Sequence, residues 1–209
     1  MENNPQAEQM GHESMVRNLD HQARAIWPQE APLFDRYDLP AAVAAVRAIS
    51  GADSVQVVAV NELADARTVL HLSKYDSTHG RFPADITGDE QSLTVDGDRI
   101  ELLRQEGLDA LPWEALGVDL VLECTGAYSD RASVQGHLDR GAGRVLFSQP
   151  AQSDVDATVV FGVNHDTLEA EHTIVSNASC TTNVIVPVIK ALHDAIGIEY
   201  GTITTIHSA

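Results

Sequence analysis

The sequence predicts an α/β protein built on a parallel β-sheet. Two observations carry this prediction. From about residue 41 onward, short runs of β-branched and apolar residues alternate with longer helical patterns, and polar or glycine residues follow most of these runs. Ligands of such sheets bind at the carboxyl ends of the strands, so residues directly after a predicted strand are the first candidates for a site.

The first elements of the pattern alternate in type. An alanine-rich segment favours a helix that ends at Gly51, and the β-branched run VQVVAV predicts a buried parallel strand. Asp96-Gly97 is typical of a two-residue hairpin turn. The elements expected here are a helix at 41–50, a strand at 55–60, a helix at 64–75 and a hairpin around 92–103.

The rest of the chain repeats strand and helix. Several strands run into glycine, proline or serine, as expected where a parallel strand meets a binding loop. The expected strands are 118–126, 144–150, 157–163, 173–176 and 200–207, and the expected helices are 131–141 and 181–197.

Composition limits the class of protein. The chain has 209 residues with a net charge of −18 and is 44% hydrophobic, which supports the core of one domain and part of a second and argues against disorder. A polyanionic surface disfavours nucleic acid as a partner.

No apolar run approaches the roughly 18–20 residues of a membrane span, and the polar N-terminus is unlike a signal peptide. The two cysteines, Cys124 and Cys180, form no disulfide framework, so we expect a reducing compartment, the cytoplasm.

Cys180 is the strongest candidate for chemistry. It lies where the strand 173–176 gives way to a helix, and Asn177 and Ser179 are candidate N-caps. A helix N-terminus favours thiolate, and its free backbone N–H groups can hold an oxyanion formed when the thiolate attacks a carbonyl. The alternative is a structural cysteine, as most free cysteines are.

His207 is the candidate base. A helix of about 15 residues rises roughly 22 Å, and a strand over 201–207 returns about as far, which would bring His207 near Cys180. A Cys–His pair is a standard activated nucleophile. A lone histidine satisfied in the core is the alternative. The other histidines lack metal-ligand spacing, and we propose no metal site.

Asn61 and Glu62 follow the strand VQVVAV directly. An acidic residue at this place binds the adenosine ribose in dinucleotide-binding sheets. The usual companion is a glycine-rich loop 20–30 residues earlier, but the window 28–41 contains no glycine. An ordinary turn is therefore the alternative at this position.

Several motifs resemble the glyceraldehyde-3-phosphate dehydrogenase superfamily over residues 41–209. They are KYDSTHGRF (74–82), ECTGAY (123–128), LFSQP (146–150), SNASCTTN (176–183) and TTIHSA (204–209). Within the superfamily, NELAD (61–65), LPWEALGVD (111–119) and FSQPAQSDVDATVVFGVN (147–164) look most like the D-erythrose-4-phosphate dehydrogenase branch.

The resemblance implies roles for residues of this chain. Cys180 would attack the aldehyde of erythrose 4-phosphate and His207 would activate the thiol, with NAD as cofactor and a thioester that water opens to 4-phosphoerythronate. Ser179 and Thr181 would contact the substrate, and the cofactor contacts would be Asn61, Glu62, Thr125, Gly126, Ser148 and Pro150. The product would feed pyridoxal 5′-phosphate synthesis, and the family forms homotetramers. Glyceraldehyde 3-phosphate as the substrate is the alternative.

The resemblance also implies an incomplete domain organisation. Residues 1–40 stand where the family carries its first strand and glycine-rich loop, and segment 17–37 faintly resembles the leader of some S-adenosylmethionine-dependent methyltransferases. We expect an incomplete Rossmann-like parallel sheet at 41–176, the partial NAD-binding domain, followed at 177–209 by the truncated start of an α+β catalytic domain. An inactive, truncated remnant is the alternative to an enzyme.

Overall fold

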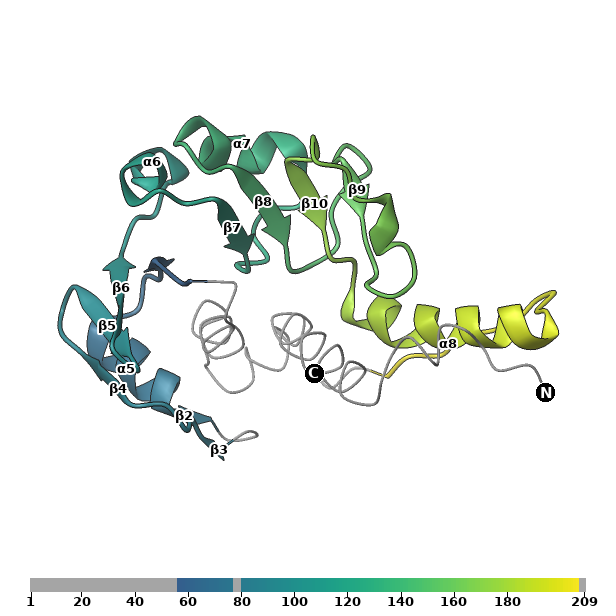
Figure 1. Cartoon of the computed structure of the whole chain (residues 1–209), viewed down its shortest axis with the longest axis horizontal. Helices are drawn as coiled ribbons and strands as arrows, with labels where there is room; N and C mark the ends of the chain where they lie inside the picture. Colours follow the sequence, from purple (N-terminus) through teal and green to yellow (C-terminus); the bar gives the residue numbers. More distant parts are fainter. Residues whose placement is uncertain (1–55, 77–79, 207–209) are drawn as a thin grey trace.

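The computed structural model describes residues 56–76 and 80–206. These residues form an α/β structure with two four-stranded sheets and one two-stranded sheet. Figure 1 shows the strands β1, β4, β5 and β6 at the left, β7–β10 at the top, and helix α8 extending to the right. The helix predicted at 41–50, its stop at Gly51 and the segments within residues 1–40 lie outside the described residues.

The first sheet has the order β1-β6-β5-β4. The predicted parallel strand is confirmed as a short one, since β1 (Ala59–Asn61) pairs in parallel with β6 (Asp98–Leu103). The predicted hairpin is confirmed too: β5 (Ser92–Val95) meets β6 at Asp96 and Gly97, whose φ angles of 50° and 98° suit a two-residue turn. Sequence analysis missed β4 (Ile86–Gly88), antiparallel to β5.

Helix α5 (Ala66–Lys74) covers the first sheet. Asp65 caps it, accepting a hydrogen bond from the backbone N–H of Thr68. Val69 and Leu93 are almost fully buried in the core that this helix forms with the sheet. The small sheet of β2 (Tyr75–Asp76) and β3 (Gly80–Arg81) follows the helix. The helix predicted at 64–75 is therefore confirmed.

The second sheet is entirely parallel, with the order β7-β8-β10-β9. Helix α7 (Arg131–Asp139) connects the neighbouring strands β7 (Leu120–Glu123) and β8 (Arg144–Phe147). A capping box between Asp130 and Ser133 begins α7. The remaining elements are η2 (Leu108–Ala110), α6 (Trp113–Leu116), β9 (Ala157–Thr158), η3 (His165–Thr167) and β10 (Ile174–Ser176). The predicted α/β class with an incomplete Rossmann-like parallel sheet is confirmed.

A second apolar core joins the second sheet to its covering helices. Phe147 and Ile174 have no exposed surface, and Trp113 of α6 is 5% exposed beside them. Val58, directly before β1, and Ala59 and Leu103 of the first sheet also pack against this core. The start of β1 and the carboxyl end of β6 thereby lie against the second core.

Helix α8 (Cys180–Ile196) confirms the predicted long helix. Its outer face carries an apolar stripe with a spacing of four residues, and no other element in the described part of the chain buries it; the stripe consists of Val184, Val188, Leu192 and Ile196. In the described part of the chain, the hydrogen bonds that tie α8 to the preceding loop come from its first turn.

The strand predicted over 200–207 is wrong for residues 200–206. These residues form no strand, and Ile203 and Ile206 are 57% and 95% exposed. β-branched residues favour strands because they pack well on a paired, half-buried surface, and the described residues offer this segment no strand to pair with. The strand propensity of residues 200–206 was therefore not enough to form a strand in the absence of a neighbouring strand.

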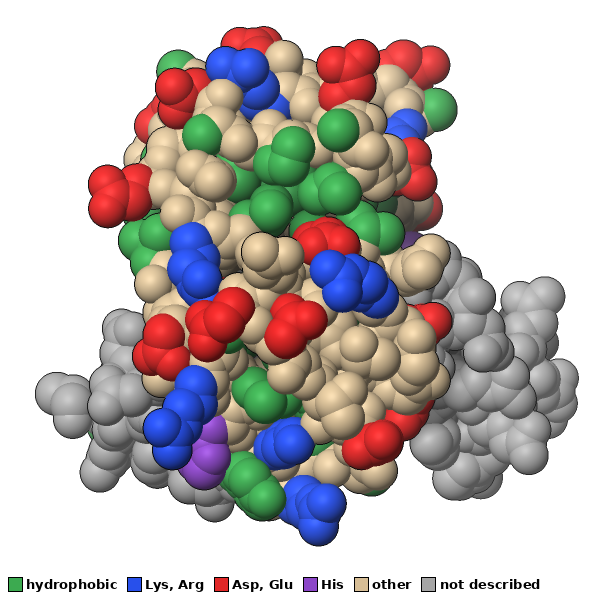
Figure 2. All heavy atoms as spheres, turned by 90° about the vertical axis from the view of Figure 1, so that its left-hand side faces the viewer, with side chains coloured by type: hydrophobic (Ala, Val, Ile, Leu, Met, Phe, Trp, Pro, Cys, Tyr) green, Lys and Arg blue, Asp and Glu red, His purple; other side chains and the backbone are tan. Residues whose placement is uncertain are grey.

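The surface of the first sheet is of mixed charge. Figure 2 shows acidic and basic side chains beside one another on this side of the molecule. Arg99 contacts Glu101 at 2.9 Å, and Arg104 lies 3.7 Å from Glu90. The face drawn there thus carries no continuous basic surface. Within the described ranges, no helix is long and apolar enough to cross a membrane.

Candidate active site

The carboxyl ends of three parallel strands meet at one edge of the second sheet. Phe147 is paired with Glu123 on one side and with Ser176 on the other. The ladder continues past the strands, because the Ser148 N–H donates to the Glu123 carbonyl and the Asn177 N–H donates to the Phe147 carbonyl, both at 3.0 Å. The segments that follow β7, β8 and β10 therefore lie side by side.

The segment after β10 makes a tight turn into α8. Ala178 has a φ of 57°, a conformation that costs energy for any residue other than glycine. The Ser176 hydroxyl holds this turn by accepting a hydrogen bond from the Ala178 N–H at 3.1 Å. Cys180 is then the first residue of α8, as predicted, and is half-buried.

Ser179 is the N-cap of α8. Its hydroxyl oxygen accepts from the Thr182 N–H at 2.9 Å and shares a hydrogen bond with the Thr182 hydroxyl at 2.7 Å. The predicted substrate contact thus has a structural task in the helix start. Thr181, the other predicted substrate contact, is half-buried next to Cys180.

Sequence analysis missed the part played by Asn183. Its side-chain amide donates to the carbonyls of Asn177 and Ser179, at 2.6 and 3.0 Å, and so ties the first turn of α8 to the preceding loop. Asn183 is 9% exposed. Its presence in the motif SNASCTTN was a signal that could have identified it.

The two cysteines differ sharply in environment. Cys124 is 6% exposed, and burial raises the pKa of its thiol to about 12, although a hydrogen bond with Ser148 acts in the opposite direction. A thiol of this kind stays protonated and inert near neutral pH. Cys180 is more exposed than Cys124 and lies at a helix N-terminus. It is therefore the candidate nucleophile among the described residues.

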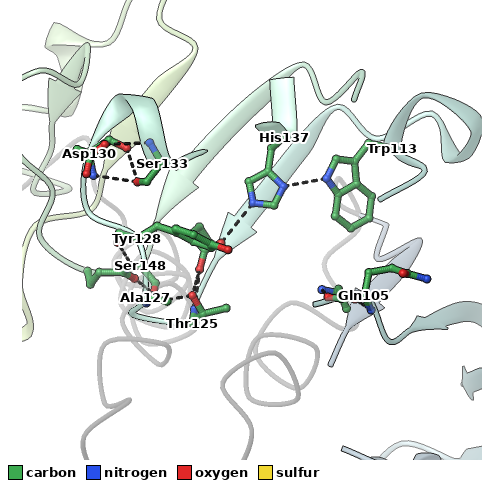
Figure 3. A network of polar contacts seen from close by, with 12 residues as sticks. Gln105, Trp113, Thr125, Ala127, Tyr128, Asp130, Ser133, His137 and Ser148 are labelled. Carbon is green, nitrogen blue, oxygen red and sulfur yellow. Dashed lines mark hydrogen bonds and ion pairs between the residues drawn. The ribbon is translucent and has the colours of Figure 1, made fainter. Parts of the chain in front are cut away.

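The segment after β7 forms a hydrogen-bonded turn. The Thr125 N–H and hydroxyl both donate to Glu123 Oε1, at 2.8 and 2.5 Å, and the Ala127 N–H donates to the Thr125 hydroxyl oxygen at 3.1 Å. Gly126 has a φ of 71°, which suits glycine. The turn is exposed, and Figure 3 shows it near Tyr128 and Ser148.

Gln149, which sequence analysis also missed, connects the three segments. Its side-chain amide donates to the Tyr128 carbonyl at 3.0 Å, its Oε1 accepts from the Ser148 hydroxyl at 2.8 Å, and its backbone carbonyl accepts from the Ser176 hydroxyl at 2.8 Å. Ser148 is buried and Pro150 is exposed. The sequence signal that could have identified Gln149 was its position between the two predicted cofactor contacts in LFSQP.

The carboxyl end of β1 carries the other predicted cofactor residues. The Asn61 side chain exchanges two 2.9 Å hydrogen bonds with the backbone of Gln105 and so clamps the chain after β6. Glu62 is half-buried, and the only hydrogen bond of its carboxylate within the described ranges comes from the Ala64 N–H, which donates to Oε1 at 3.3 Å. Of the two side chains, Glu62 keeps the larger capacity to accept hydrogen bonds from a ligand.

His207 lies outside the described residues, so the structure does not test its predicted approach to Cys180. That approach depends on a predicted strand over 201–207, and residues 201–206 form no strand. The described ranges contain no group of three His, Cys, Asp or Glu side chains placed to hold a metal ion.

Comparison with known protein families adds to this geometry. Residues 43–131 match the family model described as glyceraldehyde 3-phosphate dehydrogenase, NAD binding domain. Residues 179–209 match the model described as glyceraldehyde 3-phosphate dehydrogenase, C-terminal domain. Together the two matches cover more than half of the chain. The chain carries two domains of the glyceraldehyde-3-phosphate dehydrogenase family. Its matched domains are those of an NAD-dependent oxidoreductase, and NAD is the cofactor of the first.

The described residues of these glyceraldehyde-3-phosphate dehydrogenase domains fit NAD. A half-buried carboxylate with spare acceptor capacity, Glu62, suits the hydroxyls of a ribose. An exposed turn with a glycine at positive φ, Thr125-Gly126, lets backbone and ligand approach closely. These features lie at the carboxyl ends of parallel strands, the usual ligand edge of such sheets.

Proposed function

We propose that this member of the family oxidises a phosphorylated sugar aldehyde, erythrose 4-phosphate, to 4-phosphoerythronate through a thioester on Cys180. One observation carries the proposal. Cys180 begins α8 directly beyond β10, at the sheet edge where the turns after β7 and β8 also lie. This shared sheet edge supports a site in which Cys180 is the proposed nucleophile and Thr125 and Ser148 are proposed cofactor contacts.

Cys180 supplies the covalent step. Its thiolate forms a bond to the aldehyde carbon, and the carbonyl oxygen becomes an oxyanion. Loss of a hydride from that carbon leaves the thioester, and water then breaks the C–S bond to release the acid. The first N–H groups of a helix have no intrahelical acceptor, so the start of α8 can stabilise both the thiolate and the oxyanion.

His207 is the proposed base of this reaction. It follows the described residues directly, and the family resemblance gives it the role of taking the thiol proton. The substrate contacts proposed beside Cys180 are Ser179 and Thr181. Ser179 already uses its hydroxyl to cap α8, so its contact with substrate would come from a side chain with fixed orientation.

The proposed cofactor contacts are Glu62, Thr125, Gly126, Ser148 and Pro150, with Asn61 acting on the loop at Gln105. When bound, NAD supplies the acceptor for the hydride. The chain's own contribution is to hold these turns in place, through the Gln149 bonds at one end and the Asn61 bonds at the other.

The choice of erythrose 4-phosphate rests on motifs of the sequence, NELAD (61–65) and FSQPAQSDVDATVVFGVN (147–164). Glyceraldehyde 3-phosphate is the second candidate substrate, and the family description of both matched domains favours it. Location in the cytoplasm, assembly as a homotetramer and supply of pyridoxal 5′-phosphate synthesis are further parts of the proposal.

The experiment measures NADH formation by the purified full chain with each of the two aldehydes, in the presence and absence of inorganic phosphate. We expect NADH from erythrose 4-phosphate without a need for phosphate, since water opens the thioester. A strict requirement for phosphate, with glyceraldehyde 3-phosphate as the better substrate, would support the second candidate.

Two cysteine variants control the assay. Cys180→Ala removes the proposed nucleophile and should abolish NADH formation. Cys124→Ala removes a buried thiol with a raised pKa and should leave NADH formation intact. NADH formation that survives in Cys180→Ala would overturn the mechanism. A chain that forms no NADH from either aldehyde would favour the inactive alternative.

A further inference from the structure

A chain of buried polar side chains runs behind the Thr125 turn. The Trp113 indole N–H donates to His137 Nδ1 at 2.9 Å, and His137 Nε2 lies 3.3 Å from Glu123 Oε2 (Figure 3). The three residues are 5%, 3% and 3% exposed. Burying an ionisable pair this deeply is costly unless every group has a partner, so the arrangement calls for a reason.

The direction of these hydrogen bonds follows from the chemistry of indole. The Trp113 Nε1–H is a donor only, so His137 Nδ1 must accept and carries no proton. The one proton of the neutral imidazole is therefore on Nε2 and is donated to the Glu123 carboxylate. Trp113 fixes the tautomer of His137, and His137 fixes the orientation of Glu123.

Glu123 in turn fixes the direction of the hydrogen bond that the Thr125 hydroxyl makes. Burial opposes ionisation of Glu123, but its hydrogen bonds with His137 and with the Thr125 hydroxyl and N–H outweigh that effect and lower its pKa. Glu123 Oε1 accepts both Thr125 donors, at 2.8 and 2.5 Å. The single hydroxyl proton of Thr125 is therefore used inside the protein. Toward a ligand, this hydroxyl oxygen can only accept.

We propose that Trp113, His137 and Glu123 are positioning residues for the NAD site, which hold the Thr125–Ala127 turn so that it offers the cofactor a hydrogen-bond acceptor. The groups of NAD that such an oxygen would recognise are donors, namely ribose hydroxyls or amide N–H groups. This inference rests on the proposed contact of Thr125 and Gly126 with the cofactor. The three residues act through the turn and do not touch NAD themselves.

The first test reads the hydrogen-bond direction without any cofactor. The imidazole nitrogen chemical shifts of His137, measured by NMR on the full chain near neutral pH, should show a protonated Nε2 and an unprotonated Nδ1. His137→Gln identifies the signals. A proton on Nδ1, in the neutral ring or in an imidazolium, would overturn the inference.

The second test uses the fixed direction of the chain. In Glu123→Gln, an amide NH₂ must face either the His137 Nε2–H or the two Thr125 donors, and Trp113 prevents His137 from changing tautomer. We expect NAD to bind about tenfold more weakly, as measured by calorimetry. In either orientation of the amide, Thr125 loses the charged carboxylate acceptor or the new side chain loses its hydrogen bond with His137.

Adding Trp113→Phe removes the donor that fixes the tautomer. His137 can then accept from the new amide, and the Thr125 bonds re-form. The double variant Trp113→Phe/Glu123→Gln should therefore bind NAD within about threefold of Trp113→Phe alone, a strongly non-additive result. If the double variant loses a further tenfold relative to Trp113→Phe, the effects are additive and the inference is wrong.

Two further variants separate the inference from its premise. Ser73→Ala removes a buried hydroxyl that donates to the Val69 carbonyl in α5, away from the turn, and should leave NAD affinity unchanged. Thr125→Val keeps the side-chain shape and removes the hydroxyl. If Thr125→Val does not weaken NAD binding, the cofactor contact itself is wrong. If it does and Glu123→Gln does not, the contact stands and the positioning role alone fails.

Discussion

The Ser176 hydroxyl donates a 2.8 Å hydrogen bond to the backbone carbonyl of Gln149 and thereby ties the strand leading to Cys180 to the turn after β8. The same hydroxyl accepts from the Ala178 N–H, so one buried oxygen holds both the neighbouring turn and the strained residue before the N-cap. Ser176 has no exposed surface. The position of Cys180 relative to the proposed cofactor turns therefore depends on this contact.

Ser176→Ala should reduce catalysis beyond its effect on stability. Losing one buried hydrogen bond lowers the free energy of unfolding by about 1–2 kcal/mol. Because the Cys180 loop also loses its tie to Gln149, we expect NADH formation to fall about tenfold. Chemical denaturation and the NADH assay on the same protein sample measure the two effects.

Ser73→Ala is a matched control for that variant. Ser73 is equally buried and donates to a backbone carbonyl at 2.7 Å, but in α5 of the first sheet. The Ser73→Ala variant should lose a similar amount of free energy of unfolding and should keep its NADH-forming activity. Equal losses of activity in the two variants would show that Ser176 matters for stability only.

Ala178 should tolerate glycine and reject a β-branched residue. Its φ of 57° suits glycine, and it is only 4% exposed. We expect Ala178→Gly to stay within about 1 kcal/mol of the parent chain in the free energy of unfolding. Ala178→Val should lose about 2 kcal/mol or more, from backbone strain and crowding together. Equal stability of the two variants in urea unfolding would contradict the strained turn.

Alkylation should distinguish the two cysteines. Burial raises the pKa of the Cys124 thiol to about 12, so it is almost wholly protonated at about pH 8, whereas Cys180 is half-exposed at the start of α8. Iodoacetamide should modify Cys180 first, as followed by mass spectrometry of the peptides, and Cys124 only after unfolding. Preferential labelling of Cys124 in the folded protein would refute this account of the site.

Most elements of the fold could be predicted because local chemistry and tertiary pairing agree. Asp96-Gly97 forms the predicted turn, and the capping residues Asp65 and Ser179 begin their helices. The predicted strand at 200–207 failed for residues 200–206 because strand propensity was its only support. The strand β4 was missed because three residues, Ile86–Gly88, carry too little pattern of their own.

The candidate site could be predicted only in part, for a related reason. Cys180, Thr125 and Glu62 each follow a strand, so their position in the chain identified them. Gln149 and His137 act through partners distant in sequence: His137 lies 24 residues from Trp113 and 14 from Glu123. No local pattern reveals such contacts before the strands are placed.

Asp156 should make stability depend on pH in the acid range. Its Oδ2 accepts from the N–H groups of Thr173 and Ile174, and Arg131 pairs with its other oxygen. Burial opposes ionisation of this carboxyl, but these contacts and the Thr173 hydroxyl outweigh it and lower the pKa to about 2.

The sign of the effect follows from that lowered pKa. The stabilisation is complete above the unfolded value of about 3.9 and is lost as pH falls through about 2. At neutral pH, Asp156→Asn should therefore lower the free energy of unfolding by about 1 kcal/mol, since solvent screens the charges around this exposed carboxyl, and the difference from the parent chain should shrink as pH approaches 2. Asp166→Asn removes the same charge at an exposed position and therefore controls for the reduced net negative charge. Denaturant unfolding over this pH range measures the difference, and a gap that stays constant down to the lowest pH would show that ionisation of Asp156 contributes nothing to stability.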